Sequence, residues 1–366
     1  MNRLRQLEQL GQSIWLDYIR RDLLTSGELK RLVEEDGVSG VTSNPTIFAK
    51  AIAEDTHYDE SISRLQRQTP GIDSQTLFER IEVEDIQLAA DVLRPVYDRT
   101  AGNDGYVSIE VDPALAYDSA KSISEARRLW NEVLRPNLMV KIPATVEGLS
   151  PIEELTAQGI NVNVTLIFSL AQYEDVIEAY LRGAERNTDP RNLRSVASFF
   201  VSRVDTAVDR ALDEIGTEEA LSLRGKTGIA NARLAYCRFR QVFSGKGLER
   251  LETRGIAIQK PLWASTSTKN KAYSDVMYIE GLIGADTINS VPPEALAAFK
   301  DHGRPEIALS DDVTLAQDVI GKLVALEINP HSIGQELTEE GVEKFQKSRD
   351  ELIVSLDRKR KRLLAA

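Results

Sequence analysis

Lys141 is the residue whose place in the sequence most strongly suggests chemistry. It interrupts an apolar run, following Leu138-Met-Val and preceding Ile142-Pro, and lysine is rarely buried fully without a purpose. A lysine that is removed from water gives up its proton more readily and can then attack a carbonyl carbon to form a Schiff base. The alternative interpretation is a salt-bridged lysine at a strand end whose charged group reaches water.

Two carboxylates, Asp17 and Glu110, are expected beside this lysine. Each stands at the end of a short alternating segment, Ser13-Ile-Trp-Leu-Asp17 and Tyr106-Val-Ser-Ile-Glu110. Formation and hydrolysis of an iminium ion require proton transfers, which positioned carboxylates can carry out. The pattern therefore predicts an amine nucleophile with two acid–base groups.

The elements that must position these residues are short β-branched runs separated by longer helical patterns. Such alternation is typical of βα units around a parallel sheet. No G-x-G-x-x-G follows any of the runs, which favours a closed (β/α)8 TIM barrel over a dinucleotide-binding sheet. The eight predicted strands are residues 13–18, 37–42, 106–111, 138–142, 160–168, 195–201, 258–264 and 286–291.

Helix starts support this placement. Ser169 with Gln172 forms a capping-box pattern directly after the fifth strand. Ser122 with Glu125 predicts the start of another helix, which Pro136 ends.

Alternation along the strands separates an apolar face from a polar one, because successive side chains point to opposite sides. The face that carries Lys141 becomes polar near the carboxyl ends of the strands, and active sites of barrels lie at that end. The polar face contains Ser13, Trp15 and Asp17 on the first strand, Tyr106, Ser108 and Glu110 on the third, Met139 and Lys141 on the fourth, and Asn161, Asn163 and Thr165 on the fifth.

Composition excludes several classes of protein. The 366 residues carry a formal net charge of −12, from 45 Lys and Arg against 57 Asp and Glu, which argues against nucleic acid or an anionic membrane as a partner. At 42% hydrophobic residues the chain can bury a large core, and no window approaches the roughly 18 apolar residues of a membrane span. We expect a soluble, cytoplasmic protein whose oligomeric state is open, a homodimer included.

The chain is expected to form one barrel domain over residues 1–366, with helices from about 292–366 packed on it. No long linker or repeat divides the sequence. A basic block at residues 358–362 is interpreted as a solvated helix end, and an anion-binding arm is the alternative.

The sequence predicts neither a metal site nor a cofactor. The single cysteine, Cys237, excludes an internal disulfide and multi-cysteine metal sites. The three histidines, at positions 57, 302 and 331, are too scattered to suggest a metal centre, and iminium chemistry requires none.

Six motifs in this order resemble those of the transaldolase family, in its longer single-function bacterial form, from residue 14 to about 291. A set of six in the right order is far more specific than any one of them. They are Gly40-Val-Thr-Ser-Asn44-Pro-Thr-Ile-Phe48, Ser108-Ile-Glu110-Val-Asp112, Leu138-Met-Val-Lys141-Ile-Pro-Ala144, Gly159-Ile-Asn-Val-Asn163-Val-Thr165-Leu-Ile-Phe168-Ser169, Ser198-Phe-Phe200-Val-Ser-Arg203 and Ser265-Thr-Ser267-Thr-Lys269-Asn270.

The resemblance implies ping-pong transfer of a dihydroxyacetone unit from fructose 6-phosphate or sedoheptulose 7-phosphate to erythrose 4-phosphate or glyceraldehyde 3-phosphate. Lys141 would form the imine, and Asp17 would take the proton from the C4 hydroxyl. Glu110 would handle protons during imine formation through a water held by Thr165. Asn44, Asn163 and Ser198 would hold the dihydroxyacetone hydroxyls, and Arg203 would bind the phosphate.

Position 269 departs from the family pattern, in which a phenylalanine and a second arginine are expected where this chain has Thr268-Lys269. Lysine is a phosphate cation without the bidentate fork of arginine. Lys269 is therefore a weaker phosphate-binding candidate than Arg203, with Ser267 as a helper.

Several of these residues also have purely structural interpretations. Asn44 before a proline is typical of a turn. Asn163 and Thr165 could bond to each other as barrel filling, and Arg203 could pair with Asp205 or Asp209 on its own helix. Phe200 could serve only for packing, although a ring there would also shape the donor pocket.

Two other functions stay open at this point. A fructose 6-phosphate aldolase on the same barrel would release free dihydroxyacetone, but those chains are shorter and typically have Gln in place of Glu110 and Tyr in place of Phe200. A non-catalytic sugar-phosphate binder or scaffold would not need Lys141, Asp17 and Glu110 together.

Overall fold

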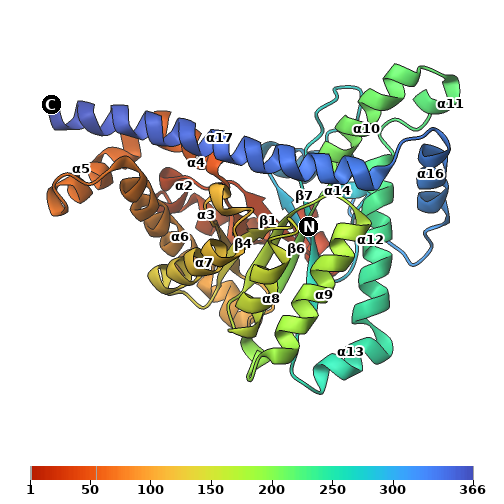
Figure 1. Ribbon diagram of the computed structural model, residues 1–366, viewed down its shortest axis with the longest axis horizontal. Helices are drawn as coiled ribbons and strands as arrows, with labels where there is room; N and C mark the ends of the chain where they lie inside the picture. The colour runs from red at the N-terminus through yellow and green to blue at the C-terminus, as the bar shows by residue number, and fades with distance from the viewer. Residues whose placement is uncertain (1, 55, 366) are drawn as a thin grey trace.

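A computed structural model describes residues 2–54 and 56–365 and shows a closed barrel of eight parallel strands in the order β1 to β8 (Figure 1). All eight predicted strands are confirmed, with ends that differ by at most two residues. The strands are β1 (Gln12–Asp17), β2 (Val38–Thr42), β3 (Tyr106–Glu110), β4 (Leu138–Pro143), β5 (Val162–Ile167), β6 (Ser195–Phe200), β7 (Gln259–Ala264) and β8 (Thr287–Val291).

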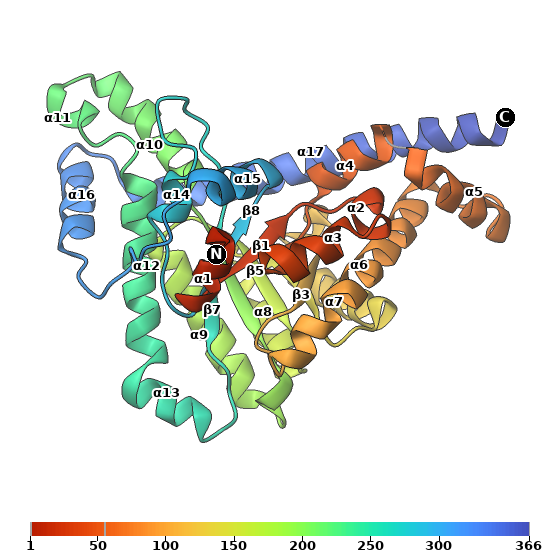
Figure 2. The same ribbon diagram turned by 180° about the vertical axis from the view of Figure 1, so that it is seen from behind.

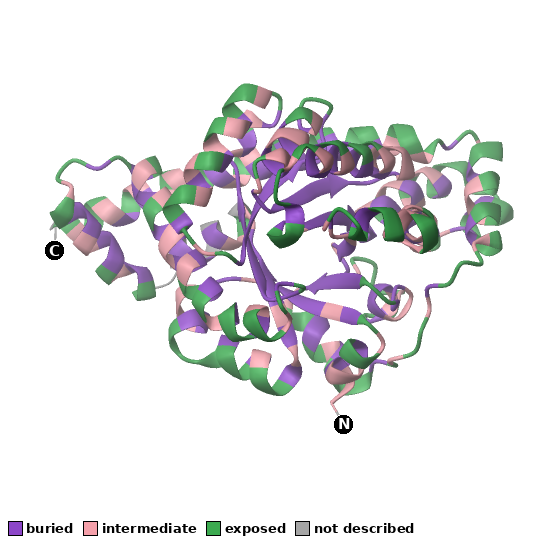
Figure 3. Ribbon diagram, turned by 90° about the horizontal axis from the view of Figure 1, so that it is seen from below, coloured by how far each residue is buried: buried purple, intermediate pink, exposed green. Residues whose placement is uncertain are grey.

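Helices surround the barrel, so that buried strands lie inside a shell whose outer surface is exposed (Figure 3). The α-helices are α1 (Arg3–Gln9), α2 (Arg21–Thr25), α3 (Glu28–Arg31), α4 (Pro45–Glu54), α5 (Asp59–Gln68), α6 (Ser74–Arg99), α7 (Ser119–Val133), α8 (Leu149–Ala157), α9 (Leu170–Arg186), α10 (Ser202–Ile215), α11 (Glu218–Leu221), α12 (Thr227–Phe243), α13 (Gly245–Glu252), α14 (Met277–Glu280), α15 (Pro293–His302), α16 (Thr314–Ala325) and α17 (Pro330–Ala365).

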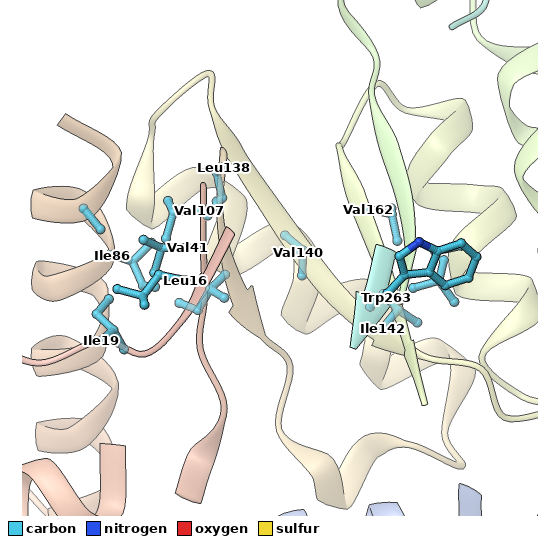
Figure 4. Close-up of a cluster of buried hydrophobic side chains, with 14 of the residues drawn as sticks. Leu16, Ile19, Val41, Ile86, Val107, Leu138, Val140, Ile142, Val162 and Trp263 are labelled. Atoms are coloured by element: carbon cyan, nitrogen blue, oxygen red, sulfur yellow. The ribbon is translucent and has the colours of Figure 1, made fainter. Parts of the chain in front are cut away.

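The two faces of the strands belong to two different apolar clusters. Outward-facing side chains such as Leu16, Val41 and Val107 pack against helices, including Ile86 of α6 (Figure 4). Inside the barrel, Trp15 and Tyr106 have ring centroids 6.4 Å apart, and Met139, Val196, Leu262 and Ile288 belong to the same apolar cluster. Polar residues of the same strand faces lie beyond this interior cluster, at the carboxyl ends of the strands.

Helix starts were predicted with mixed success. Ser169 and Gln172 form a capping box at α9, as predicted. The predicted start at Ser122 is wrong, because Asp118 caps α7 by accepting from the backbone N of Lys121. Ser122 lies inside that helix and donates to the carbonyl of Leu115 at 2.8 Å.

The C-terminal helix α17 runs along the longest dimension of the molecule, from α10 and α16 to α4 and α5 (Figures 1 and 2). Its basic block is not simply a solvated end, since Lys359 is buried, donates to the carbonyl of Ile52 at 3.1 Å and pairs with Asp59 at 2.8 Å. Arg360 donates to the carbonyl of Ile72 at 2.9 Å. These residues attach the helix to its neighbours.

No described helix is long and apolar enough to cross a membrane.

Candidate active site

A cavity of about 950 Å³ opens where the barrel strands end. It brings together most of the predicted site residues, which come from β1, β4, β5, β6 and the segments after β2, β6 and β7. Its wall includes Asp17, Asn44, Lys141, Thr165, Ser198, Phe200, Arg203, Ser267 and Lys269. The remaining predicted residues, Glu110 and Asn163, hydrogen bond to Lys141 and Ser198 of that wall.

Lys141 is buried, and its amine lies beside two oxygen atoms. Its Nζ lies 3.1 Å from Glu110 Oε2 and 3.1 Å from the backbone carbonyl oxygen of Ser43. Lys141 is 5% exposed and Glu110 7%. The salt bridge of the alternative interpretation is therefore present, but the charged group does not reach water.

Strand register explains why residues far apart in the sequence meet here. Glu110 is the Cα partner of Lys141 across β3 and β4, and Lys141 is the partner of Asn163 across β4 and β5. Parallel neighbours at one level point to the same side of the sheet. A carboxylate, an amine and an amide therefore form one row inside the barrel.

Asp17 lies on the opposite side of the barrel from that row, on β1. Thr42 donates to Asp17 Oδ1 at 2.8 Å, and Ser290 Oγ lies 2.7 Å from the same threonine hydroxyl. Burial raises the pKa of Asp17, although the nearby Lys141 ammonium acts in the opposite direction. Burial likewise raises the pKa of Glu110, again opposed by Lys141. Both carboxylates are thus stronger bases than in water.

A hydrogen-bonded chain fixes the polar residues of β3, β5 and β6. Ser198 donates to Asn163 Oδ1 at 2.7 Å, and Asn163 Nδ2 donates to Ser108 Oγ at 2.9 Å. The predicted alternative of a bond between Asn163 and Thr165 is wrong. Thr165 Oγ1 is buried and has no hydrogen-bond partner among the described residues.

The cationic end of the cavity is built around Arg203. Its guanidinium lies over the Phe200 ring, 5.3 Å from the centroid, and that ring packs against Phe168 at 5.0 Å. Phe200 therefore both packs and lines the cavity. Burial lowers the pKa of Arg203, with Asp17 opposing.

The predicted alternative in which Arg203 pairs along its own helix is not what the structure shows. Asp205 accepts from the backbone N of Gly228 at 2.7 Å and from the Tyr278 hydroxyl at 2.8 Å. Asp209 accepts from Gly225 N at 2.9 Å and from the Tyr273 hydroxyl at 2.6 Å. Arg203 is left to face the cavity.

Two weaker candidates lie at the edges. Lys269 is exposed and donates to Ser267 Oγ at 2.7 Å on the segment after β7. Asn44 is a turn residue, as one interpretation predicted, because its Oδ1 accepts from the backbone N of Ile47 at 3.1 Å in the first turn of α4. It also lines the cavity, and its role in holding a sugar hydroxyl stays a prediction.

Sequence reasoning missed three contributors to the site. Thr42 and Ser43 belong to the first motif, residues 40–48, but the motif does not indicate a role for them. Their contacts with Asp17 and Lys141 form only when the barrel closes. Phe345 of α17 also lines the cavity, and no local pattern marked it.

Among the described residues, no group of three or more His, Cys, Asp or Glu side chains could hold a metal ion.

Known proteins resemble this chain over almost its whole length. The family profile described as Transaldolase/Fructose-6-phosphate aldolase matches residues 14–356. A transaldolase of Thiobacillus denitrificans is 46% identical over 360 residues, covering 97% of this chain and 100% of that protein. The transaldolase of Thermobifida fusca is 46% identical over 359 residues and that of Mycolicibacterium smegmatis 44% over 357, with 96% of this chain covered in both, and 96% and 95% of those proteins. These matches identify an enzyme of the transferase class, and the chain belongs to the transaldolase/fructose-6-phosphate aldolase family.

Proposed function

We propose that this enzyme transfers a dihydroxyacetone unit through a Schiff base on Lys141, by a ping-pong mechanism. The donor would be sedoheptulose 7-phosphate or fructose 6-phosphate, and the acceptor glyceraldehyde 3-phosphate or erythrose 4-phosphate, as in the non-oxidative pentose phosphate pathway. The observation that carries this proposal is the buried Lys141 amine, 3.1 Å from Glu110 and in one cavity with Asp17.

The first half-reaction begins at the amine. Lys141 passes a proton to Glu110, and its free electron pair attacks the C2 carbonyl carbon of the ketose. The resulting carbinolamine loses water as Glu110 returns a proton to the departing hydroxyl, which leaves a protonated imine.

Cleavage follows at the C3–C4 bond. Asp17 takes the proton from the C4 hydroxyl, the C4 oxygen forms a carbonyl, and the electrons of the broken bond move into the iminium to give an enamine. The first aldehyde leaves, the second aldehyde enters, and the same steps in reverse release the product. The raised pKa of Asp17 suits this base role.

The remaining residues bind and orient the sugar. Asn44, Asn163 and Ser198 are proposed to hold the dihydroxyacetone hydroxyls, and Thr165 a water that serves Glu110. The buried hydroxyl of Thr165, which has no hydrogen-bond partner within residues 2–54 and 56–365, supports that assignment. Arg203 would bind the phosphate, with Lys269 and Ser267 as an exposed secondary contact. The reaction as proposed needs no cofactor.

Borohydride trapping tests the imine. Incubation with fructose 6-phosphate and sodium borohydride should add the mass of a reduced three-carbon adduct to the peptide that contains Lys141. Lys141→Met should abolish the labelling, because the other described lysines of the cavity wall, Lys269 and Lys300, are exposed to water and lack the burial that favours the free amine. Labelling that survives in a folded Lys141→Met protein would refute the assignment.

A fructose 6-phosphate aldolase is the second candidate, since the matching family includes that activity. Glu110 and Phe200 favour the transferase. A coupled assay of fructose 6-phosphate with and without erythrose 4-phosphate distinguishes the two, because abundant free dihydroxyacetone that is unaffected by the acceptor would support the aldolase. The single domain, the cytoplasmic location and a homodimer stay predictions.

A further inference from the structure

Helix α17 supplies a side chain to the reaction cavity although it is not part of the βα repeat. It lies against β5, α4, α6 and α10 and passes across the carboxyl ends of the strands (Figures 1 and 2). Phe345, near the middle of this helix, is 6% exposed and lines the cavity that contains Lys141.

One end of the crossing is fixed at an irregularity of β5. The pairing of β5 with β6 shifts register between Val164 and Ile167, and Leu166 there has a φ of 60°. Bulges and left-handed residues of this kind are found next to active sites, where they redirect the strand. Thr338 of α17 donates to the carbonyl of Leu166 at 3.3 Å.

Small residues allow the helix to approach this bulge closely. A Cβ placed on Gly341 would lie 2.8 Å from Leu166 Cδ2, and one on Gly334 would lie 2.9 Å from the Cβ of Ser169. Glycine at these positions brings the helix axis nearer to the barrel than any larger residue would allow.

The other end of the crossing is fixed by a buried cation. Arg349, one turn beyond Phe345, has 7% side-chain exposure and pairs with Asp112 at 3.1 Å and with Glu79 at 3.4 Å. Its guanidinium also lies 5.2 Å from the centroid of the Phe78 ring. The segment between Gly341 and Arg349 is therefore held at both ends.

Held in this way, the Phe345 ring faces both cations of the site. Lys141 Nζ lies 5.8 Å from the ring centroid and the Arg203 guanidinium carbon 5.9 Å. An aromatic face attracts a nearby cation, and the attraction grows when water is excluded. The ring carries no group that could hold a water molecule.

We propose that Phe345 is a specificity-determining residue of the transfer reaction. Its ring closes the cavity between the reacting amine and the phosphate arginine, orients the cationic imine by its face, and keeps water from the dihydroxyacetone adduct until the second aldehyde arrives. The proposal rests on the Schiff-base function above.

The test is the ratio of free dihydroxyacetone released to dihydroxyacetone transferred, measured with fructose 6-phosphate and erythrose 4-phosphate. Phe345→Leu keeps an apolar side chain but removes the ring, and should raise this ratio about three- to tenfold, the range expected for losing a cation–π contact and its water exclusion. Phe345→Met, with a flexible apolar chain, should do the same and provides a second measurement if the leucine variant folds poorly.

Leu352→Ala is the matched control, since Leu352 is a 1% exposed core residue of the same helix and packs in the outer apolar cluster. It should lower the melting temperature and leave the ratio unchanged. An unchanged ratio in both Phe345 variants would overturn the proposal, as would an equal rise in Leu352→Ala. Borohydride labelling of Lys141 in the wild type distinguishes a failure of the Schiff-base function from a failure of the role of Phe345. If Lys141 is not labelled, the proposed function itself is refuted. If Lys141 is labelled and the ratio is unchanged in the Phe345 variants, only the role of Phe345 is refuted.

Discussion

Lys141 and Glu110 are both nearly fully buried and make their ion pair 3.1 Å apart inside the barrel. A pair of this kind contributes little net stability, but removing one partner leaves a buried charge without compensation, at a cost of about 3–5 kcal/mol. Substitutions at either position are therefore expected to change the stability of the fold as well as the proposed chemistry. Variants of the site have to be compared as folded proteins, with the melting temperature measured beside the activity.

The two phosphate candidates should differ in effect. Arg203→Ala should raise KM strongly with a smaller change in kcat, because a charge-assisted contact worth about 1.5–3 kcal/mol is lost from ground and transition states alike. Lys269→Ala should raise KM less, since Lys269 is exposed and water screens its charge. Steady-state kinetics with fructose 6-phosphate measures both, and a large kcat loss at unchanged KM for Arg203→Ala would contradict this binding role.

Substitution of Phe200 tests whether an apolar ring at this position keeps water out of the cavity. The ring is 8% exposed and lies between Phe168 and Arg203. Phe200→Tyr places a donor and an acceptor beside the adduct, so free dihydroxyacetone from fructose 6-phosphate should increase while transfer to erythrose 4-phosphate declines. A tyrosine variant with the product ratio of the wild type would show that this side chain does not control release.

At the scale of elements, the tight packing of β2 against β1 explains a glycine of the first motif. A Cβ on Gly40 would lie 2.4 Å from the ring of Trp15, whose Nε1 donates to Asp104 at 2.9 Å. The indole is fixed by that hydrogen bond and cannot move aside without losing it. The glycine therefore serves the barrel interior rather than the reaction.

Gly40→Ala should accordingly destabilise the protein by about 1–3 kcal/mol, as overpacking in a core does. Gly321 offers the matched control, because it lies inside α16 and an added Cβ would meet nothing within 4 Å. Gly321→Ala should stabilise by about 0.5–1 kcal/mol through helix propensity. Chemical denaturation of both variants measures these changes, and equal stability of Gly40→Ala and the wild type would disprove the packing argument.

For the whole molecule, buried carboxyl groups outside the reaction make stability depend on pH. Burial raises the pKa of Glu82 to about 8, with Arg349 opposing and Glu110, Glu79 and Glu125 adding to the rise. Burial also raises the pKa of Asp85 and of Asp205 to about 6. Each of these groups binds its proton more tightly in the folded state. The free energy of unfolding is therefore highest below the unfolded-state pKa and falls as the pH rises from there to the folded-state pKa.

Glu82→Gln removes the buried carboxyl group with the largest pKa shift of these three and keeps the shape of the side chain. Below about pH 4.5 the variant and the wild type should have similar stability. The variant should then become progressively more stable than the wild type between pH 4.5 and pH 8, by up to about 5 kcal/mol, and the difference should be constant above that range. Thermal melts at pH 4, 6, 8 and 9 provide the measurement, and a difference that does not vary with pH would contradict it.

The sequence by itself determined the barrel and most of the site. Short β-branched runs between helical patterns predicted all eight strands. Alternation along those runs put Lys141, Glu110 and Asn163 on one face, because the side-chain period of a strand is a local property. The capping box at Ser169 is equally local. The start of α7 was missed because Asp118 and Ser122 are both plausible caps, and only packing selects between them.

Tertiary structure alone decided what depends on elements far apart in the chain. The contact of α17 with the shifted part of β5 at Leu166 and the contact of Phe345 with Lys141 and Arg203 lie where α17 packs against the barrel. The burial of Lys359 depends on the packing of α17 against α4 and α5. No local pattern in residues 330–365 indicates which part of the barrel will lie beneath them. The approach of a helix to a sheet is set by the shapes of both surfaces, and those shapes exist only once the barrel has closed.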